Sequence, residues 1–197
     1  MTLPNKLTVG RLVMAPLFFV MFSLRFWVGP QLTVASSIIC LVLFVAIELT
    51  DLLDGKIARA HHLVTDLGKV MDPFGDTLSH LTYFVCFMIS GIMPSWVFVV
   101  IMYREFAILF IRLLMVSQGH VMPANMWGKS KTVTYAVGGV LGILYLLLAS
   151  MMEASLLEPL YLFMQVVFVL SAIASVVSFL NYIRLIARDG SLSQMTR

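Results

Sequence analysis

The sequence has few charged residues and few cysteines. Only 12% of its 197 residues are Asp, Glu, Lys or Arg, which is about half of the roughly 25% found in soluble globular proteins. Hydrophobic residues make up 60% of the chain, and apolar runs long enough to cross a bilayer recur along its whole length. This composition excludes an ordinary soluble domain, and we expect an all-α integral membrane protein.

Several common site motifs are also missing. The two cysteines, Cys40 and Cys86, lie inside apolar runs, where a free thiol packs as a small apolar side chain, so we expect no disulfide. No Gly-x-x-x-x-Gly-Lys phosphate loop is present. An EF-hand is excluded as well, because Leu53 stands where a calcium loop needs an oxygen ligand.

Polar breaks divide the chain into six apolar segments, which we expect to form a single membrane domain over residues 1–197. The expected spans are 8–26, 32–53, 73–91, 95–117, 132–150 and 159–187. Asp72 is placed as the N-cap of the third span and Pro73 as its first helical residue, after a polar loop at 55–69. Lys6 and Arg11 before an apolar run are also typical of a signal peptide, but further spans follow and no small-x-small cleavage site does.

Basic residues indicate the orientation of these spans, because they concentrate on the cytoplasmic side of a membrane protein. Six spans place both termini on one side, and eleven of the thirteen Lys and Arg residues fall on or near that side. These are Lys6, Arg11, Lys56, Arg59, Lys69, Arg112, Lys129, Lys131, Arg184, Arg188 and Arg197. Arg25 alone falls on the opposite side, and Arg104 lies within a span. We therefore expect a multi-pass protein of the inner (cytoplasmic) membrane with both termini in the cytoplasm.

Four aspartates lie between the second and third spans. Asp51 and Asp54 end one helix, and Asp72 and Asp76 begin the next, so each pair shares a helix face. Antiparallel neighbours joined by a short loop bring these ends together, where four carboxylates repel one another unless cations lie between them. Magnesium suits such a site because it binds carboxylate and phosphate oxygens, and calcium or manganese is also compatible.

Each aspartate also has a purely structural interpretation. Asp72 could act only as a helix cap, and Asp51 and Asp54 could be solvated residues at a helix end. The spacing of all four, with glycines between them, favours a functional site. A divalent-cation transporter is an alternative, but such a protein is expected to carry polar residues near mid-membrane in several spans, and only Arg104-Glu105 qualifies.

The stretch from Asp51 to Asp76 resembles the signature of the CDP-alcohol phosphatidyltransferase family at every fixed position. It reads Asp51-Leu-Leu-Asp54-Gly55-Lys-Ile-Ala58-Arg59, eight residues, Gly68, three residues, Asp72, three residues and Asp76. The resemblance implies the six-helix fold of that family. It also implies transfer of a phosphoryl-alcohol group from a CDP-linked donor to a second alcohol, with release of CMP, at a site on the cytoplasmic side.

The resemblance also implies roles for these residues. Asp51, Asp54, Asp72 and Asp76 would hold two Mg²⁺ or Mn²⁺ ions against the pyrophosphate of the donor, and Asp76 would be the general base. The donor-binding residues would be Asp51, Asp54, Gly55, Ala58, Arg59, Thr65 and Gly68. The small residues allow the nucleotide to approach closely, and the guanidinium of Arg59 suits phosphate. His80 and Glu48 extend the polar stripe and are expected to form hydrogen bonds beside the site.

Further local matches resemble bacterial phosphatidylglycerophosphate synthases. They are Pro4-Asn5-Lys6-Leu7-Thr8 with Arg11, Thr65, Arg104-Glu105 with Arg112, and Gly128-Lys129-Ser-Lys131-Thr132. They imply CDP-diacylglycerol as donor and sn-glycerol 3-phosphate as acceptor, in a membrane-lipid setting, with a homodimer and no nucleic-acid partner. Basic residues would bind the acceptor phosphate, namely Arg104, Arg112, Lys129 and Lys131.

The sequence is compatible with more than one acceptor alcohol. Many members of that group have Lys directly after the last aspartate of the signature, whereas Thr77 follows Asp76 here. Inositol phosphate, serine, choline or a second lipid therefore stay open as acceptors. Arg104-Glu105 could be an internal ion pair that orients the helices instead of a phosphate contact. Lys129 and Lys131 could serve only as cytoplasmic anchors.

Overall fold

The computed structural model describes residues 3–60, 66–117 and 126–188. It contains six long α-helices and one short 3₁₀ helix, η1, and the described residues form no β-strand. The α-helices are α1 (Leu3–Trp27), α2 (Thr33–Ala60), α3 (Asp66–Ile89), α4 (Ser95–Ser117), α5 (Met126–Ala149) and α6 (Ala154–Arg188), and η1 covers Pro30–Leu32. The expected all-α class is confirmed.

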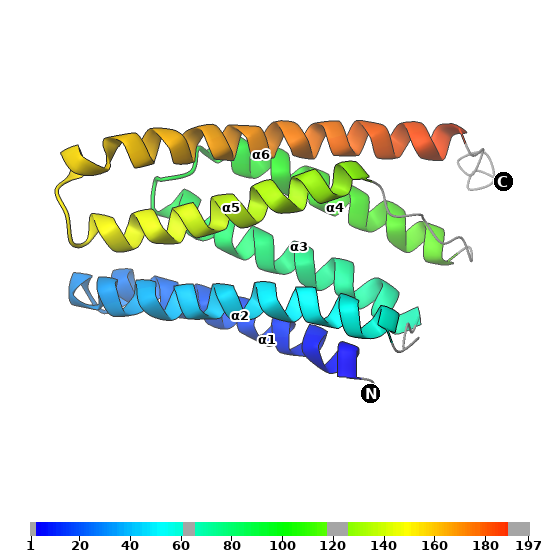
Figure 1. Cartoon of the computed structure of the whole chain (residues 1–197), viewed down its shortest axis with the longest axis horizontal. Coiled ribbons are helices and arrows are strands. Elements are labelled where there is room, and N and C mark those ends of the chain that lie inside the picture. The colour runs from blue at the N-terminus through cyan, green and yellow to red at the C-terminus, as the bar shows by residue number, and fades with distance from the viewer. Residues whose placement is uncertain (1–2, 61–65, 118–125, 189–197) are drawn as a thin grey trace.

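The helices run side by side along the long axis of an elongated bundle (Figure 1). α1 packs against α2 and α3, α5 packs against α6 and α2, and α4 packs against α3 and α6. Because successive helices alternate in direction, α1 begins, α2 ends, α3 begins and α6 ends at the same end of the bundle (Figure 1). We call this the aspartate end, since it holds Asp51, Asp54, Asp72 and Asp76.

Four helical segments are long and apolar enough to cross a membrane, namely Asn5–Trp27, Pro30–Ile57, Lys131–Ala149 and Ala154–Arg188. The other two helices are interrupted by polar and charged residues. These are Asp72, Asp76 and His80 in α3, and Arg104, Glu105 and Arg112 in α4, which is otherwise strongly apolar. Large apolar side chains are exposed on every long helix, for example Val13, Val42, Ile89, Phe110, Val133 and Leu162. Such an outer surface is suited to lipid rather than to water.

Two expected boundaries between the second and third spans are wrong. The region 55–69 was expected to be a loop, but α2 continues to Ala60 and α3 already begins at Asp66. Pro73 therefore lies inside α3 rather than at its first position, and Asp72 is not its N-cap. Pro73 is the eighth residue of α3, beyond the four N–H groups that lack partners at any helix start, so it costs the helix one backbone hydrogen bond.

Aromatic side chains fill the centre of the bundle. The rings of Phe18 and Phe44 each lie 4.9 Å from that of Tyr83, measured between centroids, and Phe84 lies 5.1 Å from Tyr135. The ring of Phe44 also lies directly over Gly139, where an added Cβ would come within 2.5 Å of it. Cys40 and Cys86 are free and buried in this core, which confirms the expectation of two packed thiols.

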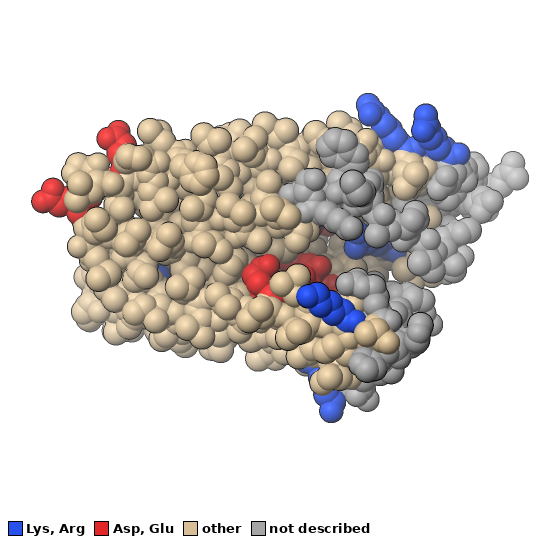
Figure 2. All heavy atoms as spheres, viewed as in Figure 1, with Lys and Arg blue, Asp and Glu red and all other residues tan. Residues whose placement is uncertain are grey.

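Charged side chains concentrate at the two ends of the bundle (Figure 2). Exposed basic residues lie near the aspartate end on four helices, namely Lys6, Lys56, Arg112, Arg184 and Arg188. The exposed acidic residues Glu153 and Glu158 lie at the opposite end, around the connection between α5 and α6. On the face shown in Figure 2, the surface between the two ends is mostly uncharged, apart from one patch of acidic side chains partway along, with a basic side chain beside it.

Candidate functional site

Three helices bring polar side chains together at the aspartate end. α2 provides Asp51 and Asp54 near its end, and α3 provides Asp72 and Asp76 near its start. Residues three or four apart lie on one face of a helix, so each pair points in one direction. α1, which packs against both α2 and α3, adds two further side chains, Thr8 and Arg11.

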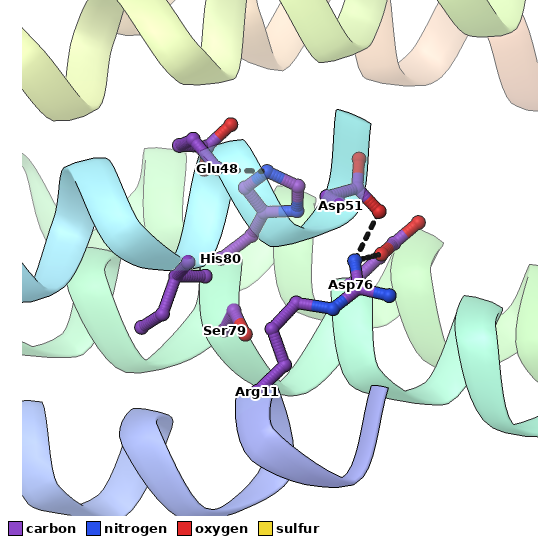
Figure 3. Close-up of a pocket in the computed structure, with 7 residues that line it drawn as sticks. Arg11, Glu48, Asp51, Asp76, Ser79 and His80 are labelled. Atoms are coloured by element: carbon purple, nitrogen blue, oxygen red, sulfur yellow. Dashed lines mark hydrogen bonds and ion pairs between the residues drawn. The ribbon is translucent and has the colours of Figure 1, made fainter. Parts of the chain in front are cut away.

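Arg11 lies at the centre of the site (Figure 3). Its Nη1 pairs with Asp51 and, at 2.5 Å, with Asp76 Oδ1, while its Nη2 lies 2.6 Å from Asp54 Oδ2. The side chain is only 1% exposed. An arginine buried among apolar helices needs carboxylate partners to offset its desolvation, and three aspartates from two different helices supply them.

Thr8 connects the fourth aspartate to the same group. Its Oγ1 donates a hydrogen bond to Asp72 Oδ1 at 2.6 Å and lies 3.4 Å from Asp54 Oδ2. Thr8 is fully buried and stands one turn before Arg11 on α1. The carboxylate of Asp72 on α3 therefore contacts α1, instead of capping the start of its own helix as expected.

The charges of this group do not balance. The side chains of Asp51, Asp54, Asp72 and Asp76 carry four negative charges. In the described part of the chain, Arg11 is the one basic side chain that forms ion pairs with them. Further positive charge is needed to hold four carboxylates together. Their hard oxygen donors fit Mg²⁺ or Mn²⁺, so the residue types suit divalent cations. Among the described residues, however, no three Asp, Glu, His or Cys side chains are already arranged as ligands of one ion, because the guanidinium of Arg11 lies between the carboxylates.

The carboxylates differ in how accessible they are. The side chains of Asp76 and Asp51 are 39% and 34% exposed, whereas that of Asp54 is 4% exposed. A small pocket opens beside the two accessible carboxylates, and Figure 3 shows the polar side chains that line it. Its lining residues are Arg11, Ile47, Glu48, Asp51, Asp76, Ser79 and His80. Asp51 and Asp76 thus present accessible carboxylates to the pocket, whereas Asp54 is enclosed.

Glu48 and His80 form the inner wall of this pocket. His80 Nε2 lies 3.8 Å from Glu48 Oε1, and neither ring nitrogen of His80 makes a hydrogen bond within the described residues. The imidazole also packs edge-on against Tyr135, with 5.3 Å between ring centroids. The expected hydrogen bond of His80 is therefore not formed here, although the residue does lie beside the aspartates.

A second buried polar group joins α4, α5 and α6. Glu105 Oε1 accepts hydrogen bonds from Arg104 Nη1 at 2.9 Å, from Lys131 Nζ at 2.8 Å and from the Tyr135 hydroxyl at 3.0 Å. Arg104 Nη2 also donates to Ser178 Oγ on α6 at 2.8 Å. The group holds two cations and one carboxylate, so it keeps one net positive charge. Of the two interpretations of Arg104-Glu105, the structure shows the ion pair.

The remaining predicted site residues are placed as follows. Gly55 is partly buried on α2 and Gly68 is buried near the start of α3. Ala58, Arg59 and Lys129 lie in helices, but their side chains are outside the described part of the structure, and Thr65 lies outside it altogether. Arg112 is exposed on α4, whereas the side chains of Arg104 and Lys131 are largely buried.

The sequence pattern does not place Thr8 and Arg11 at the aspartates. It shows both residues only as part of an N-terminal match and Arg11 also as a charge that indicates topology. A signal was nevertheless present, because a threonine and an arginine three residues apart inside an apolar run share one helix face. A buried arginine there requires acidic partners, and the four aspartates are the main acidic cluster of the sequence.

Comparisons with known proteins agree with the signature. A family model described as CDP-alcohol phosphatidyltransferase matches residues 1–186. A CDP-diacylglycerol–glycerol-3-phosphate 3-phosphatidyltransferase of Treponema pallidum (strain Nichols) is 33% identical over 93% of this chain and 88% of its own length. A protein of the same name from Bacillus subtilis (strain 168) is 36% identical over 66% of this chain and 70% of its own. A cardiolipin synthase (CMP-forming) of Streptomyces coelicolor is 32% identical over 67% of this chain and 60% of its own.

Proposed function

Because the chain belongs to the CDP-alcohol phosphatidyltransferase family, we propose that it transfers the phosphatidyl group of CDP-diacylglycerol to sn-glycerol 3-phosphate. The products are phosphatidylglycerol phosphate and CMP. One observation supports the reaction class most directly: Asp51, Asp54 and Asp76 of the signature converge on a single point at one end of the bundle. The choice of acceptor rests on the names of the relatives from Treponema pallidum and Bacillus subtilis.

The four aspartates are proposed to hold two divalent metal ions, Mg²⁺ or Mn²⁺, and the family as a whole uses divalent metal. Bound there, the ions would neutralise the negative charge that develops on the leaving CMP. Through those ions, the carboxylates would hold the donor's pyrophosphate in place. Gly55, Ala58, Thr65 and Gly68 would border the donor, and Arg59 would bind its phosphate or cytosine.

Asp76 is the proposed general base. It combines an accessible carboxylate, 39% exposed, with a place beside the pocket. Its carboxylate accepts the proton of the acceptor's terminal hydroxyl as that oxygen forms a bond to the phosphatidyl phosphorus. The bond from this phosphorus to the CMP oxygen breaks, and CMP leaves with the bonding electrons. A base within hydrogen-bond reach of the attacking hydroxyl is the geometric requirement for this step.

The acceptor's phosphate needs positive charge near the aspartates. Arg104 and Lys131 supply it, because Glu105 neutralises only one of these two buried cations. Arg112 and Lys129 are proposed to assist from the ends of α4 and α5. Ion pairs to Glu105 and contact with a phosphate are compatible, since both cations carry several N–H donors.

All six α-helices are proposed to cross the inner membrane as one domain, with both termini and the aspartate end in the cytoplasm. The exposed basic residues near that end and the acidic residues at the other support this orientation. α3 and α4 can cross in spite of their charges because most of these face partners inside the bundle. A homodimer is proposed from the family resemblance alone.

A second candidate acceptor is a lipid. It is favoured by the similarity to the cardiolipin synthase of Streptomyces coelicolor and by Thr77, which stands where many glycerol-phosphate enzymes of the family have lysine. Purified full-length protein with CDP-diacylglycerol and Mg²⁺ would be offered sn-glycerol 3-phosphate, phosphatidylglycerol, inositol phosphate and serine in parallel, while CMP is measured. We expect CMP release only when sn-glycerol 3-phosphate is the acceptor. CMP release only with phosphatidylglycerol would instead support the lipid as acceptor. No CMP release with any acceptor would refute the reaction class.

A further inference from the structure

Arg11 forms hydrogen bonds with the carboxylates that are proposed to bind the metal ions. Its two terminal nitrogens lie within bonding distance of Asp51, Asp54 and Asp76, at 2.5 Å from Asp76 Oδ1 and 2.6 Å from Asp54 Oδ2. A Mg²⁺ ion binds carboxylate oxygen at about 2.0–2.1 Å in a near-octahedral shell. The guanidinium lies between these three carboxylates, so a divalent ion bound to them would lie next to its positive charge and repel it.

The setting makes Arg11 a specific partner rather than a surface charge. Its side chain is 1% exposed, and its Nε lies near Gly75, where an added Cβ would be 3.8 Å from that atom. That Nε is buried and makes no hydrogen bond among the described residues. Among the described residues, the guanidinium thus forms hydrogen bonds through its two terminal nitrogens alone, and its Nε–H donor is unused.

We propose that Arg11 is an exchangeable counter-ion of the metal site: it pairs with Asp51, Asp54 and Asp76 and gives up these contacts when divalent cations bind. This inference rests on the proposed function, because it takes the same aspartates as the metal ligands. Arg11 then has two effects of opposite sign. It holds α1 against α2 and α3 by offsetting part of the carboxylate repulsion, and it weakens the apparent affinity for metal by competing for the same oxygens.

The competition predicts an effect that a merely structural arginine would not have. Replacing Arg11 by glutamine removes the positive charge and leaves a polar side chain. In the presence of a chelator the variant should unfold at a lower temperature than the parent, since four carboxylates then face one another without a cation. Its metal affinity should nevertheless rise. We expect the half-saturating Mn²⁺ concentration to fall on the order of tenfold, the factor that corresponds to losing one modest charge-assisted contact.

The test uses the purified full-length protein in detergent, without substrate. Free Mn²⁺ is counted by its electron paramagnetic resonance signal during titration, and the Tm is recorded at each Mn²⁺ concentration. Lys6→Gln is the matched control, because Lys6 is an exposed cation on the same helix and, within the described structure, forms no ion pair with the aspartates. Its half-saturating concentration should equal that of the parent. Arg11→Lys should fall between parent and Arg11→Gln, since an ammonium cannot fork across three carboxylates.

The results separate this inference from the proposed function. A parent that binds Mn²⁺, with Arg11→Gln at a lower half-saturating concentration, supports both. A parent that binds Mn²⁺, with Arg11→Gln at an equal or higher one, overturns the exchange and leaves the proposed metal site standing. A parent that binds no Mn²⁺ at all overturns both. If Arg11→Gln cannot be purified folded, the comparison of Arg11→Lys with the parent decides in the same way, with tighter binding expected in the variant.

Discussion

Glu105 is the residue whose replacement tests the internal polar group most sharply. Its Oε1 accepts hydrogen bonds from Arg104, Lys131 and Tyr135, and the residue is 4% exposed. Glu105→Gln keeps the shape of the side chain but leaves two buried cations without a counter-charge. Breaking a buried ion pair by removing one partner costs about 3–5 kcal/mol. For a chain of this length, with a shift of about 2–4 °C for each kcal/mol, the Tm should fall by roughly 6–20 °C.

The assay is thermal unfolding of the purified protein in detergent, followed by tryptophan fluorescence. Glu153→Gln serves as the matched control, because Glu153 is exposed beyond the far end of α5, where a substitution changes stability by about 0.5 kcal/mol or less. Tyr135→Phe removes the contacts of the hydroxyl with Glu105 and with Ser175, each 3.0 Å long, but no charge, and should cost about 1–3 kcal/mol. A Tm for Glu105→Gln that matches that of Glu153→Gln would refute the conclusion that Glu105 neutralises Arg104 and Lys131.

Three further predictions concern catalysis and packing. Asp76→Asn should abolish CMP release while CDP-diacylglycerol binding stays measurable, and near-normal turnover would remove Asp76 as the base. Lys131→Gln should raise the KM for glycerol 3-phosphate at least tenfold with a smaller effect on the KM for the donor; equal changes in both would argue against a phosphate contact. Gly139→Ala should destabilise by about 1–3 kcal/mol through overpacking against Phe44, whereas Gly10→Ala, with open space around it, should not lower the Tm.

The helices of this protein are predictable because long apolar runs and their polar breaks are local features. The ends of the helices are less predictable. α2 continues past Gly55 and α3 starts before Pro73, because helix packing offsets the one backbone hydrogen bond that a proline inside a helix removes. The gathering of the four aspartates follows from two antiparallel neighbours, which the sequence also indicates.

The contacts between distant helices are the part that the sequence does not give. Arg11 stands 40 residues before Asp51, and no local pattern states that α1 packs against both α2 and α3. Likewise, Lys131 could serve as a membrane anchor, a phosphate ligand or an ion-pair partner. Only the tertiary arrangement, in which α4 and α5 both pack against α6, brings it to Glu105. Such choices depend on which helix faces meet, and composition alone does not decide them.

The central claim is that this protein joins a phosphatidyl group to glycerol 3-phosphate, and its most direct test follows the acceptor into the lipid product. Purified protein would be given CDP-diacylglycerol, Mg²⁺ and radiolabelled sn-glycerol 3-phosphate, with Asp76→Asn as the inactive control. We predict that label enters the chloroform-soluble fraction as phosphatidylglycerol phosphate, with one CMP released for each labelled molecule. CMP release without label in the lipid, or label in the lipid with the Asp76→Asn control at the same rate, would contradict the account.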